Sequence, residues 1–537
     1  MNRRQLLKSL ALLSGGIAVG SLMERVKSVS AQDRTRLSKY FRLPASVIVF
    51  RDGDYAVAVD RKGNVISRST EHSLVWKEAI NAIHPVPDGE IRVINGSGHE
   101  YITSESVEIP SGVIIMNSKF KLDDNANCDI VKSIDFDSLT GQNKWYVDTD
   151  GVPYRFGLIN VHIDGNKANN TAGSGIKFYG KAYILLNVLV RDCAEYGLYS
   201  ECGDVVGQHD WRDAPEIWVD WLVVRNCNLD GILYRGPHDA VFNRVFVLGN
   251  GGAGLKNERS AGVYSGGIGD IIFLHAYGND IGVDVGDVLR ASFIESESNN
   301  SIGLRVTNGA ARISYLHVFN NPINVKLETT HNMIDMLFCY GQGKTATGTI
   351  GVDIVANDNR IGLAHIYNCE TGLQVRRWNI IRARIYDCST GVKLGTDTTP
   401  AHNILDLVMS GCNTYIDIYG TGYGNFVRMT CYTSAGETVL SGTYSDDDRI
   451  DIIARGAVVG RTINKGIATF SGDGSTTTFN IPHGLLSAPS VYNVSPLTPD
   501  ADAPRTVTAD ASNIIITYST APPSGTDNLK FYWEAKV

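Results

Sequence analysis

Short runs in which apolar and polar residues alternate recur along most of the chain. Clear examples are Ile184–Val190, Val219–Val224, Ile361–Tyr367 and Ile380–Tyr386. Alternation with a period of two predicts β-strands that bury one face. Helical spacing is absent from these regions. The pattern therefore predicts a chain built mainly from short strands.

A repeated phrase follows these runs. An Asn or a Cys comes first, a Gly follows within a few residues, and apolar residues then alternate again. The copies are Cys193–Leu198, Cys227–Ile232, Asn250–Leu255, Asn279–Val283, Asn299–Leu304, Cys369–Leu373 and Cys388–Val392, with a weaker copy at Cys412–Ile416. Most neighbouring glycines lie 19 to 28 residues apart. One such unit cannot bury its apolar face alone, but a stack of units can.

This repeat length predicts a right-handed parallel β-helix in which each phrase occupies the same corner of its coil. Asn side chains stacked at one corner can bond along the stack, and Cys can serve there as a small buried hydrophobe. Cys369 and Cys388 are then neighbours in consecutive coils. Because Asn fills the same place in other copies, redox or metal chemistry is disfavoured there. A disulfide between the two cysteines stays open.

The repeat resembles the pectate-lyase-like (pectin lyase-fold) β-helix superfamily, which includes tailspike-like and surface proteins. An amphipathic segment, His72–Ile83, and the sequence Val107-Glu-Ile-Pro-Ser-Gly-Val113 resemble the entry to such helices. The resemblance implies a capping helix over the first coil. It divides the chain into a β-hairpin region with the capping helix (32–88) and a β-helix (89–456). Asp164 resembles a turn residue of this superfamily and is expected to be structural.

The last seventy residues have a different pattern. Six alternating runs between positions 465 and 537 are separated by the turn sequences Gly472–Ser475 and Pro522–Gly525. Such punctuation is typical of antiparallel strands. The pattern predicts a small C-terminal β-sandwich module, which serves either for attachment or trimerisation or as a plain folded cap.

Residues 1–31 are typical of an export signal. Arg3, Arg4 and Lys8 precede an apolar run that ends in Val29-Ser30-Ala31, and the Arg pair resembles a twin-arginine signal. The mature chain is then expected outside the cell or at its surface, and no other stretch is apolar for long enough to span a bilayer. The net charge is −8, and a basic stripe is missing, so nucleic acid is not an expected partner.

We expect the functional residues in the lengthened coils, because long loops on one side of a β-helix shape a groove. Residues 202–216 and 249–267 are two such places. Together they offer an aromatic platform, carboxylates and cations, which a sugar site needs. We predict Asp210, Asp213 and Glu258 as catalytic residues. The predicted substrate-binding residues are His209, Trp211, Arg212, Glu216, His238, Lys256 and Arg259.

These observations favour an exported β-helix protein that binds a polysaccharide or cell-surface glycan. They leave open whether it also cleaves the glycan, as a lyase or a glycoside hydrolase. A hydrolase would need a carboxylate pair and no cofactor. A lyase would use a Lys or Arg base, with carboxylates or Ca²⁺ neutralising an acidic sugar. The alternative is a non-enzymatic adhesin, tailspike-like or surface protein that assembles as a homotrimer.

Overall fold

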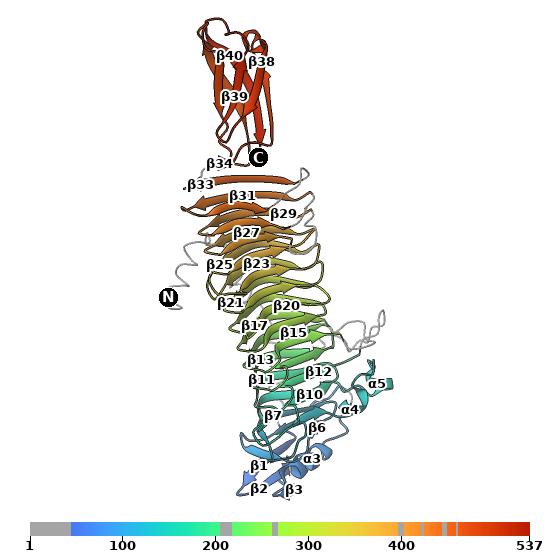
Figure 1. Ribbon diagram of the computed structural model, residues 1–537. Helices are drawn as coiled ribbons and strands as arrows, with labels where there is room; N and C mark the ends of the chain where they lie inside the picture. Colours follow the sequence, from blue (N-terminus) through green and yellow to red (C-terminus); the bar gives the residue numbers. More distant parts are fainter. Residues whose placement is uncertain are drawn as a thin grey trace.

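The computed structural model describes residues 45–87, 89–203, 217–259, 267–395, 402–419, 424–442, 448–457 and 460–537. The predicted export signal over residues 1–31 lies outside them. Figure 1 shows a long column of stacked coils with a second group of strands at its C-terminal end. The described part is a right-handed parallel β-helix with little helix, which confirms the predicted fold class.

One wall of the column is a 14-stranded parallel sheet of short strands. Its strands are β6 (Val107–Ile109), β8 (Val131–Ser133), β10 (Ile176–Tyr179), β12 (Leu198–Glu201), β14 (Ile232–Arg235), β16 (Ala253–Glu258), β18 (Ile281–Gly286), β20 (Ile302–Val306), β22 (Ile323–Leu327), β24 (Ile350–Ile354), β26 (Thr371–Val375), β28 (Thr390–Leu394), β30 (Thr414–Ile418) and β32 (Thr438–Gly442). Each strand pairs with its equivalent one coil away.

The rest of the wall belongs to a 20-stranded sheet. Within the column its strands are β4 (Arg92–Asn95), β5 (Glu100–Thr103), β7 (Val113–Leu122), β9 (Gly157–Asp164), β11 (Tyr183–Arg191), β13 (Ile217–Arg225), β15 (Ala240–Leu248), β17 (Ile268–Tyr277), β19 (Leu289–Glu297), β21 (Ala311–Phe319), β23 (Met333–Tyr340), β25 (Arg360–Tyr367), β27 (Ile380–Tyr386), β29 (Ile404–Ser410), β31 (Phe426–Thr433), β33 (Arg449–Gly456) and β34 (Gly460–Arg461). Left-handed residues such as Asn160 and Asn187 bend some of these strands midway.

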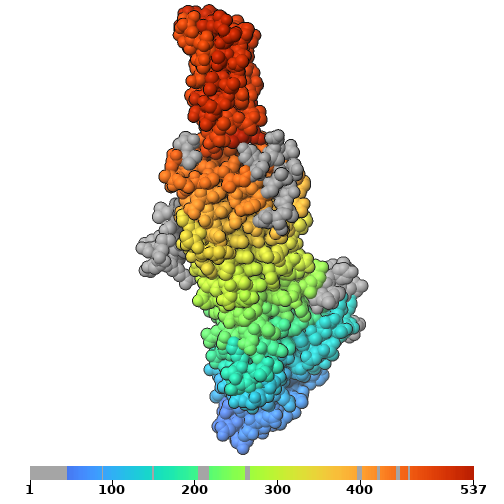
Figure 2. Space-filling model, viewed as in Figure 1, coloured from blue at the N-terminus to red at the C-terminus, as the bar shows by residue number. Residues whose placement is uncertain are grey.

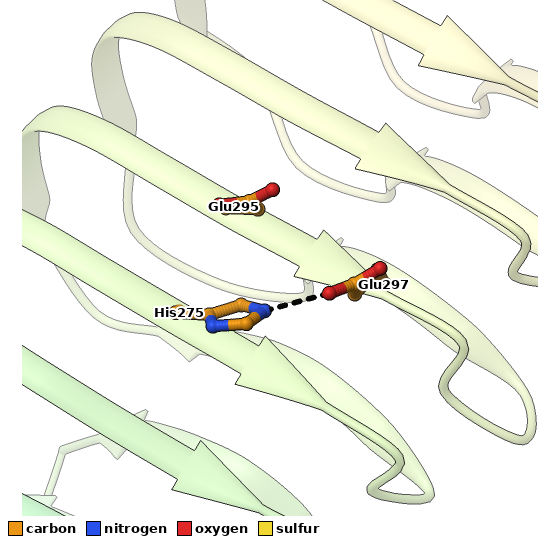
Figure 3. A group of neighbouring side chains, drawn as sticks. All are labelled: His275, Glu295 and Glu297. Atoms are coloured by element: carbon orange, nitrogen blue, oxygen red, sulfur yellow. Dashed lines mark hydrogen bonds and ion pairs between the residues drawn. The ribbon is translucent and has the colours of Figure 1, made fainter. Parts of the chain in front are cut away.

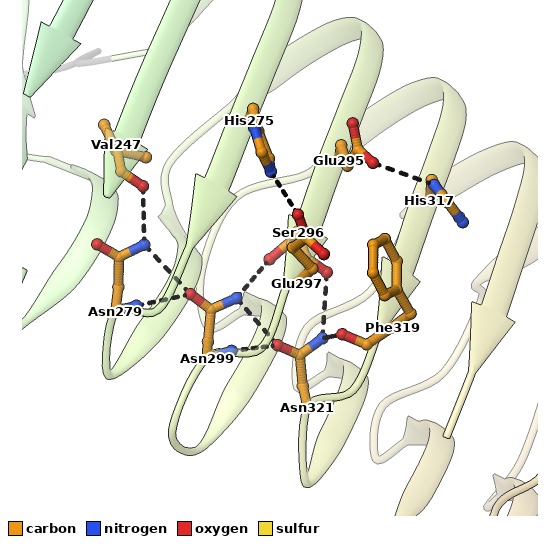
Figure 4. Close-up of polar contacts among 10 residues, drawn as sticks. All are labelled: Val247, His275, Asn279, Glu295, Ser296, Glu297, Asn299, His317, Phe319 and Asn321. Atoms are coloured by element: carbon orange, nitrogen blue, oxygen red, sulfur yellow. Dashed lines mark hydrogen bonds and ion pairs between the residues drawn. The ribbon is translucent and has the colours of Figure 1, made fainter. Parts of the chain in front are cut away.

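Apolar side chains from both sheets fill the interior of the column as one continuous core. At one corner, buried Asn residues bond from coil to coil, as the repeat predicts. The Asn279 N–H donates to Asn299 Oδ1 at 3.0 Å, and the Asn299 N–H donates to Asn321 Oδ1 at 2.8 Å (Figure 4). Cys227 shares this corner, because its N–H donates to Asn250 Oδ1 at 3.0 Å. Asn and Cys are therefore alternative occupants of one structural position.

A second Asn ladder, which the repeated phrase does not reveal, lies just before the long strands. In each step a backbone N–H donates to the Asn side-chain oxygen of the next coil, and Asp448 ends the series. Its members are Asn332, Asn359, Asn379, Asn403, Asn425 and Asp448. Two ladders thus satisfy buried backbone donors at two corners of the coil.

All nine cysteines are free thiols. Cys369 and Cys388 are buried in consecutive coils, and each thiol donates to the carbonyl two residues earlier, at 3.3 Å and 3.4 Å. The neighbouring Cys369 thiol and burial raise the pKa of Cys388 well above its usual range. Cys369 and Cys388 are therefore buried side chains of the apolar core.

The N-terminal end of the column is capped as predicted. Three antiparallel strands, β1 (Val47–Asp52), β2 (Tyr55–Asp60) and β3 (Val65–Ser69), form the hairpin region. Helix α3 (His72–Asn81) follows. Its Trp76 is fully buried against Tyr101 and Phe120 of the first coils, with ring centroids 5.2 and 5.0 Å away. The helix therefore covers the apolar end of the stack.

The C-terminal region contains all six predicted strands, arranged as two three-stranded antiparallel sheets. They are β35 (Ile463–Gly472), β37 (Val491–Pro496) and β40 (Gly525–Lys536) in one sheet, and β36 (Thr478–Pro482), β38 (Arg505–Ala509) and β39 (Asn513–Tyr518) in the other, with a 3₁₀ turn, η1, over Pro499–Asp502. Their apolar residues form a separate core. Figure 2 shows this module as a narrow tip on the column.

Candidate functional site

A row of polar side chains, here called the polar row, runs along the outer face of the 14-stranded sheet. Its members occupy the same register position in consecutive strands from β16 to β30. They are Lys256, Asp284, Arg305, Lys326, Asp353, Gln374, Lys393 and Asp417. Neighbouring strands lie about 4.8 Å apart, so the row presents a charged or amide group at every step.

Two pairs of adjacent members of the polar row hold each other in place. Arg305 donates to both carboxylate oxygens of Asp284, at 3.0 and 2.6 Å, in a fork geometry that fixes both side chains. Asp284 is almost fully buried, so this pairing also offsets the cost of its desolvation. Three coils after this pair, Gln374 donates to Asp353 at 3.1 Å. These two pairs fix four members of the row.

Glu258, at the end of β16, is held between two cations. Arg235 donates to it through Nε at 2.9 Å, and Lys256 Nζ lies 2.7 Å from its second oxygen. Burial alone would raise the pKa of Glu258, but the hydrogen bonds from Lys256 and Arg235, together with their charges, lower it below its ordinary value. Glu258 is thus a fixed carboxylate that stays ionised.

An open pocket of about 250 Å³ lies beside this carboxylate. Three predicted site residues, Glu258, Lys256 and Arg259, line it together with Asp284, Thr307 and Asn308. Arg259 is placed by Asp287, whose Oδ1 it approaches to 3.1 Å. The pocket therefore joins cations, carboxylates, a hydroxyl and an amide from three consecutive coils, a donor and acceptor set suited to a polyhydroxylated ligand.

Asp230 is a second carboxyl group near Lys256 and Glu258. It precedes β14 in the coil corner and accepts a hydrogen bond from the Ala253 N–H at 2.7 Å. Burial raises its pKa above the ordinary value, and the charge on Glu258 adds to the effect. Asp230 and Glu258 therefore differ in protonation behaviour. Opposite pKa shifts in neighbouring carboxyl groups are a feature of acid–base sites.

An insertion between β8 and β9 covers the outer face of the sheet below the pocket. It carries the short helices α4 (Phe136–Leu139) and α5 (Val147–Asp150) and buries Trp145. Glu201 of β12 accepts hydrogen bonds from Thr140 at 2.8 Å and from the Gly141 N–H at 2.7 Å. The insertion forms a wall at one end of the site.

Tyr199 connects this wall to the pocket. Its hydroxyl donates to Glu201 at 2.8 Å and accepts from Arg235 at 2.7 Å. Arg235 in turn binds Glu258. His238, predicted to bind substrate, lies against the insertion, with its ring centroid 5.7 Å from that of Trp145, and its role stays a prediction.

The predicted residues Asp210, Asp213, His209, Trp211, Arg212 and Glu216 lie outside the described residues, so their roles stay predictions. The structure brings Glu258, Lys256 and Arg259 together. Motif reasoning missed Arg235, Tyr199, Asp230 and the polar row. A signal for the row exists: Lys256, Asp284 and Arg305 each stand two residues after a repeat glycine. Asp164 is a turn residue as predicted, accepting from the Asn166 N–H at 2.9 Å.

The outer face of the 20-stranded sheet carries a stack of aromatic rings. Phe273, Phe293 and Tyr315 stack face to face across three coils, with centroids 5.4 and 5.0 Å apart. Because their faces cover one another, these rings offer edges rather than a flat platform to a ligand. The polar row is therefore the stronger candidate for recognition of a polar polymer.

Neither a protein-family model nor a curated protein matches the sequence. Solved structures that are similar to this chain include the A-module of the mannuronan C-5 epimerase AlgE6 of Azotobacter vinelandii (13% identity, TM-score 0.41, covering 70% of this chain and 96% of that one). The tailspike of E. coli bacteriophage HK620 is another (9% identity, TM-score 0.35, covering 89% and 92%). At these identities and scores, the likeness carries no argument about function.

No helix among the described residues is long and apolar enough to cross a membrane.

Proposed function

We propose that this chain binds a polysaccharide along the polar row, with one sugar unit seated in the pocket beside Glu258. The observation that carries the proposal is the pocket itself: Glu258 is fixed by Arg235 and Lys256 at the start of a row that continues for seven further strands. A polymer with a repeating set of hydroxyl and carboxylate groups can meet such a row at several steps. Export and a cell-surface location are part of this proposal.

Glu258, which lines the pocket, and Asp230, in the coil corner before β14, are the pair that we propose for hydrolysis of a glycosidic bond. Such a reaction needs one carboxylate that is ionised and one carboxyl group that holds its proton. The pKa of Glu258 is lowered and that of Asp230 is raised, so both shifts are in the direction that these roles require. In the proposed reaction Asp230 protonates the leaving oxygen, and Glu258 acts as the base or nucleophile. A cofactor is not required for this chemistry.

A screen of plant, algal and bacterial polysaccharides, read by binding and by release of reducing ends, tests the proposal. We expect Lys256→Met with Arg259→Met to weaken binding of the best ligand at least about tenfold, since two cations leave the pocket. Glu258→Gln and Asp230→Asn should abolish turnover and retain binding.

Asp220→Asn is the matched control for Glu258→Gln, because Asp220 pairs with Arg244 in a similar ion pair on the opposite face, at 2.7 Å. Unchanged binding in the Lys256/Arg259 variant would contradict the binding site. Binding without turnover in the wild type would leave the binding proposal in place and refute hydrolysis, in favour of an adhesin or tailspike-like role.

A further inference from the structure

A cluster of imidazole and carboxylate groups lies on the outer face of the 20-stranded sheet, away from the polar row. Figure 3 shows His275 of β17 with Glu295 and Glu297 of β19. One donor atom from each of the three residues can be chosen such that all lie within 4.8 Å of one another. His275 Nε2 is 2.9 Å from Glu297 Oε1.

A second histidine extends the cluster to a third coil. His317 of β21 places Nδ1 3.6 Å from Glu295 Oε1 (Figure 4). The strand register explains the grouping, because His275, Glu295 and His317 are direct partners across β17, β19 and β21. Glu297 is two residues beyond Glu295 on the same strand and reaches His275 diagonally. One imidazole and two carboxylates thus converge from two coils, and the imidazole of His317 lies beside Glu295 on the third.

Each of the two carboxylates lies next to an imidazole. Glu297 pairs with His275 and Glu295 with His317, whereas Asp220 and Asp406 on the outer face pair with arginines. A neutral imidazole is a metal ligand, whereas a guanidinium is not.

The backbone that carries the two glutamates is fixed from inside. Ser296, between them, points into the core, donates to the Gly303 carbonyl at 2.8 Å and accepts from Asn299 Nδ2 at 3.0 Å (Figure 4). Asn299 belongs to the buried Asn ladder. Glu295 and Glu297 are therefore held outward by a rigid strand, which is the preorganisation that a metal site requires.

Aromatic residues surround the cluster. On β17, β19 and β21 an aromatic residue stands two positions before His275, Glu295 and His317. These residues are Phe273, Phe293 and Tyr315. Tyr277 and Phe319 flank Glu297 on the strands to either side, by register. The four donor side chains are between 21% and 27% exposed. Apolar surroundings of this kind limit access of water and strengthen charge interactions at a bound cation.

We propose that His275, Glu295 and Glu297 bind one divalent transition-metal ion, with Zn²⁺ as the probe, and that His317 turns toward it as the fourth ligand. Nitrogen and carboxylate ligands lie about 2.0–2.2 Å from Zn²⁺, so donor atoms of one site lie roughly 3–4.4 Å apart. The donor atoms of His275, Glu295 and Glu297, which lie within 4.8 Å of one another, need only small side-chain rotations. Two carboxylates balance the charge of the ion. Two imidazoles favour a transition metal over Ca²⁺ or Mg²⁺, which prefer oxygen ligands. The ion would join three consecutive coils.

Calorimetric titration of the full chain, purified without a histidine tag and treated with a chelator, tests this site. We expect saturable one-to-one binding of Zn²⁺ and none of Mg²⁺ at the same concentration. Zn²⁺ should also raise the Tm of the wild type. His275→Ala and Glu297→Gln should each weaken Zn²⁺ binding at least about tenfold and remove the rise in Tm.

His365→Ala is the matched control, because His365 occupies the same row two coils after His317 but stacks on Phe338, with centroids 4.8 Å apart. It should bind Zn²⁺ as the wild type does. If a ligand variant fails to fold, visible absorption of the Co²⁺-loaded wild type still tests the site, since imidazole and carboxylate ligation gives d–d bands. Absence of these bands, no Zn²⁺ binding by the wild type, or equal binding by the Glu297→Gln variant would overturn the proposal.

Discussion

Asn279 and Asn299 occupy the same corner of consecutive coils, and the side-chain oxygen of Asn299 accepts both the backbone N–H of Asn279, at 3.0 Å, and its side-chain Nδ2, at 3.2 Å. Both residues are fully or almost fully buried. Each rung therefore satisfies donors that water cannot reach. The ladder therefore adds hydrogen bonds to the support that the apolar core gives the column.

Replacing Asn299 by Ala should destabilise the column strongly. The change leaves buried donors of Asn279 without their acceptor, at a cost of about 1–3 kcal/mol for each. We expect a lower Tm in calorimetry. Asn413→Ala is the control, because Asn413 is exposed and makes only a long side-chain bond, of 3.4 Å to Ser389. Equal Tm values for the two variants would show that the ladder adds little.

The capping helix offers a second stability test. Trp76→Ala removes a fully buried ring between α3 and the first coils and should cost about 3–5 kcal/mol. Leu74→Ala, on the exposed side of the same helix, should change the free energy of unfolding by less than about 0.5 kcal/mol. Protease resistance of the N-terminal coils gives the readout, and a Trp76→Ala protein as resistant as the wild type would argue against a capping role.

The cysteines should behave as buried thiols. Alkylation without reductant should leave the buried cysteines of the repeat corner unmodified in the native protein; these are Cys193, Cys227, Cys369, Cys388 and Cys412. Once the chain is denatured, alkylation should modify all nine cysteines, because the structure has nine free thiols. Hydrogen-bonded, buried thiols with raised pKa values supply little thiolate for reaction. A mass showing seven modified cysteines after denaturation would instead indicate a disulfide.

The ion pairs of Glu258 make its contribution to stability dependent on pH. Its pKa is lowered in the folded chain, so the contribution is complete above the ordinary pKa of a Glu and is lost as the pH falls through the folded value. Glu258→Gln should therefore lower stability by about 1–3 kcal/mol at pH 7. The difference in Tm between variant and wild type should shrink toward pH 3. A constant difference at every pH would contradict the assigned pairing.

The coil architecture was predictable because its signals are local. Repeat spacing predicts the stack, and the Asn and Cys positions predict the ladder at one corner. The six C-terminal strands follow from alternation and turn residues in the same way. The second ladder, which begins at Asn332, was missed because the search followed the Asn/Cys–Gly repeat, whereas these asparagines are followed directly by apolar strand residues, as in His331-Asn-Met-Ile-Asp335 and His402-Asn-Ile-Leu-Asp406.

The candidate site was predictable only in part. Lys256, Glu258 and Arg259 are neighbours in the sequence, so a lengthened coil points to them. Arg235 and Asp230 reach Glu258 through pairing of strands about one coil apart, and the grouping of His275 with Glu297 depends on the same register. Such contacts depend on the exact register between paired strands. Alternation of apolar and polar residues does not determine this register.

We propose that a polysaccharide binds across the polar row at Glu258. A crystal structure of the Glu258→Gln chain with an oligosaccharide of the best ligand from the screen tests this binding site. We expect sugar density over β16 to β20, with one unit in the pocket in contact with Lys256 and Arg259. Density confined to the 20-stranded sheet or to the C-terminal module would contradict this binding site.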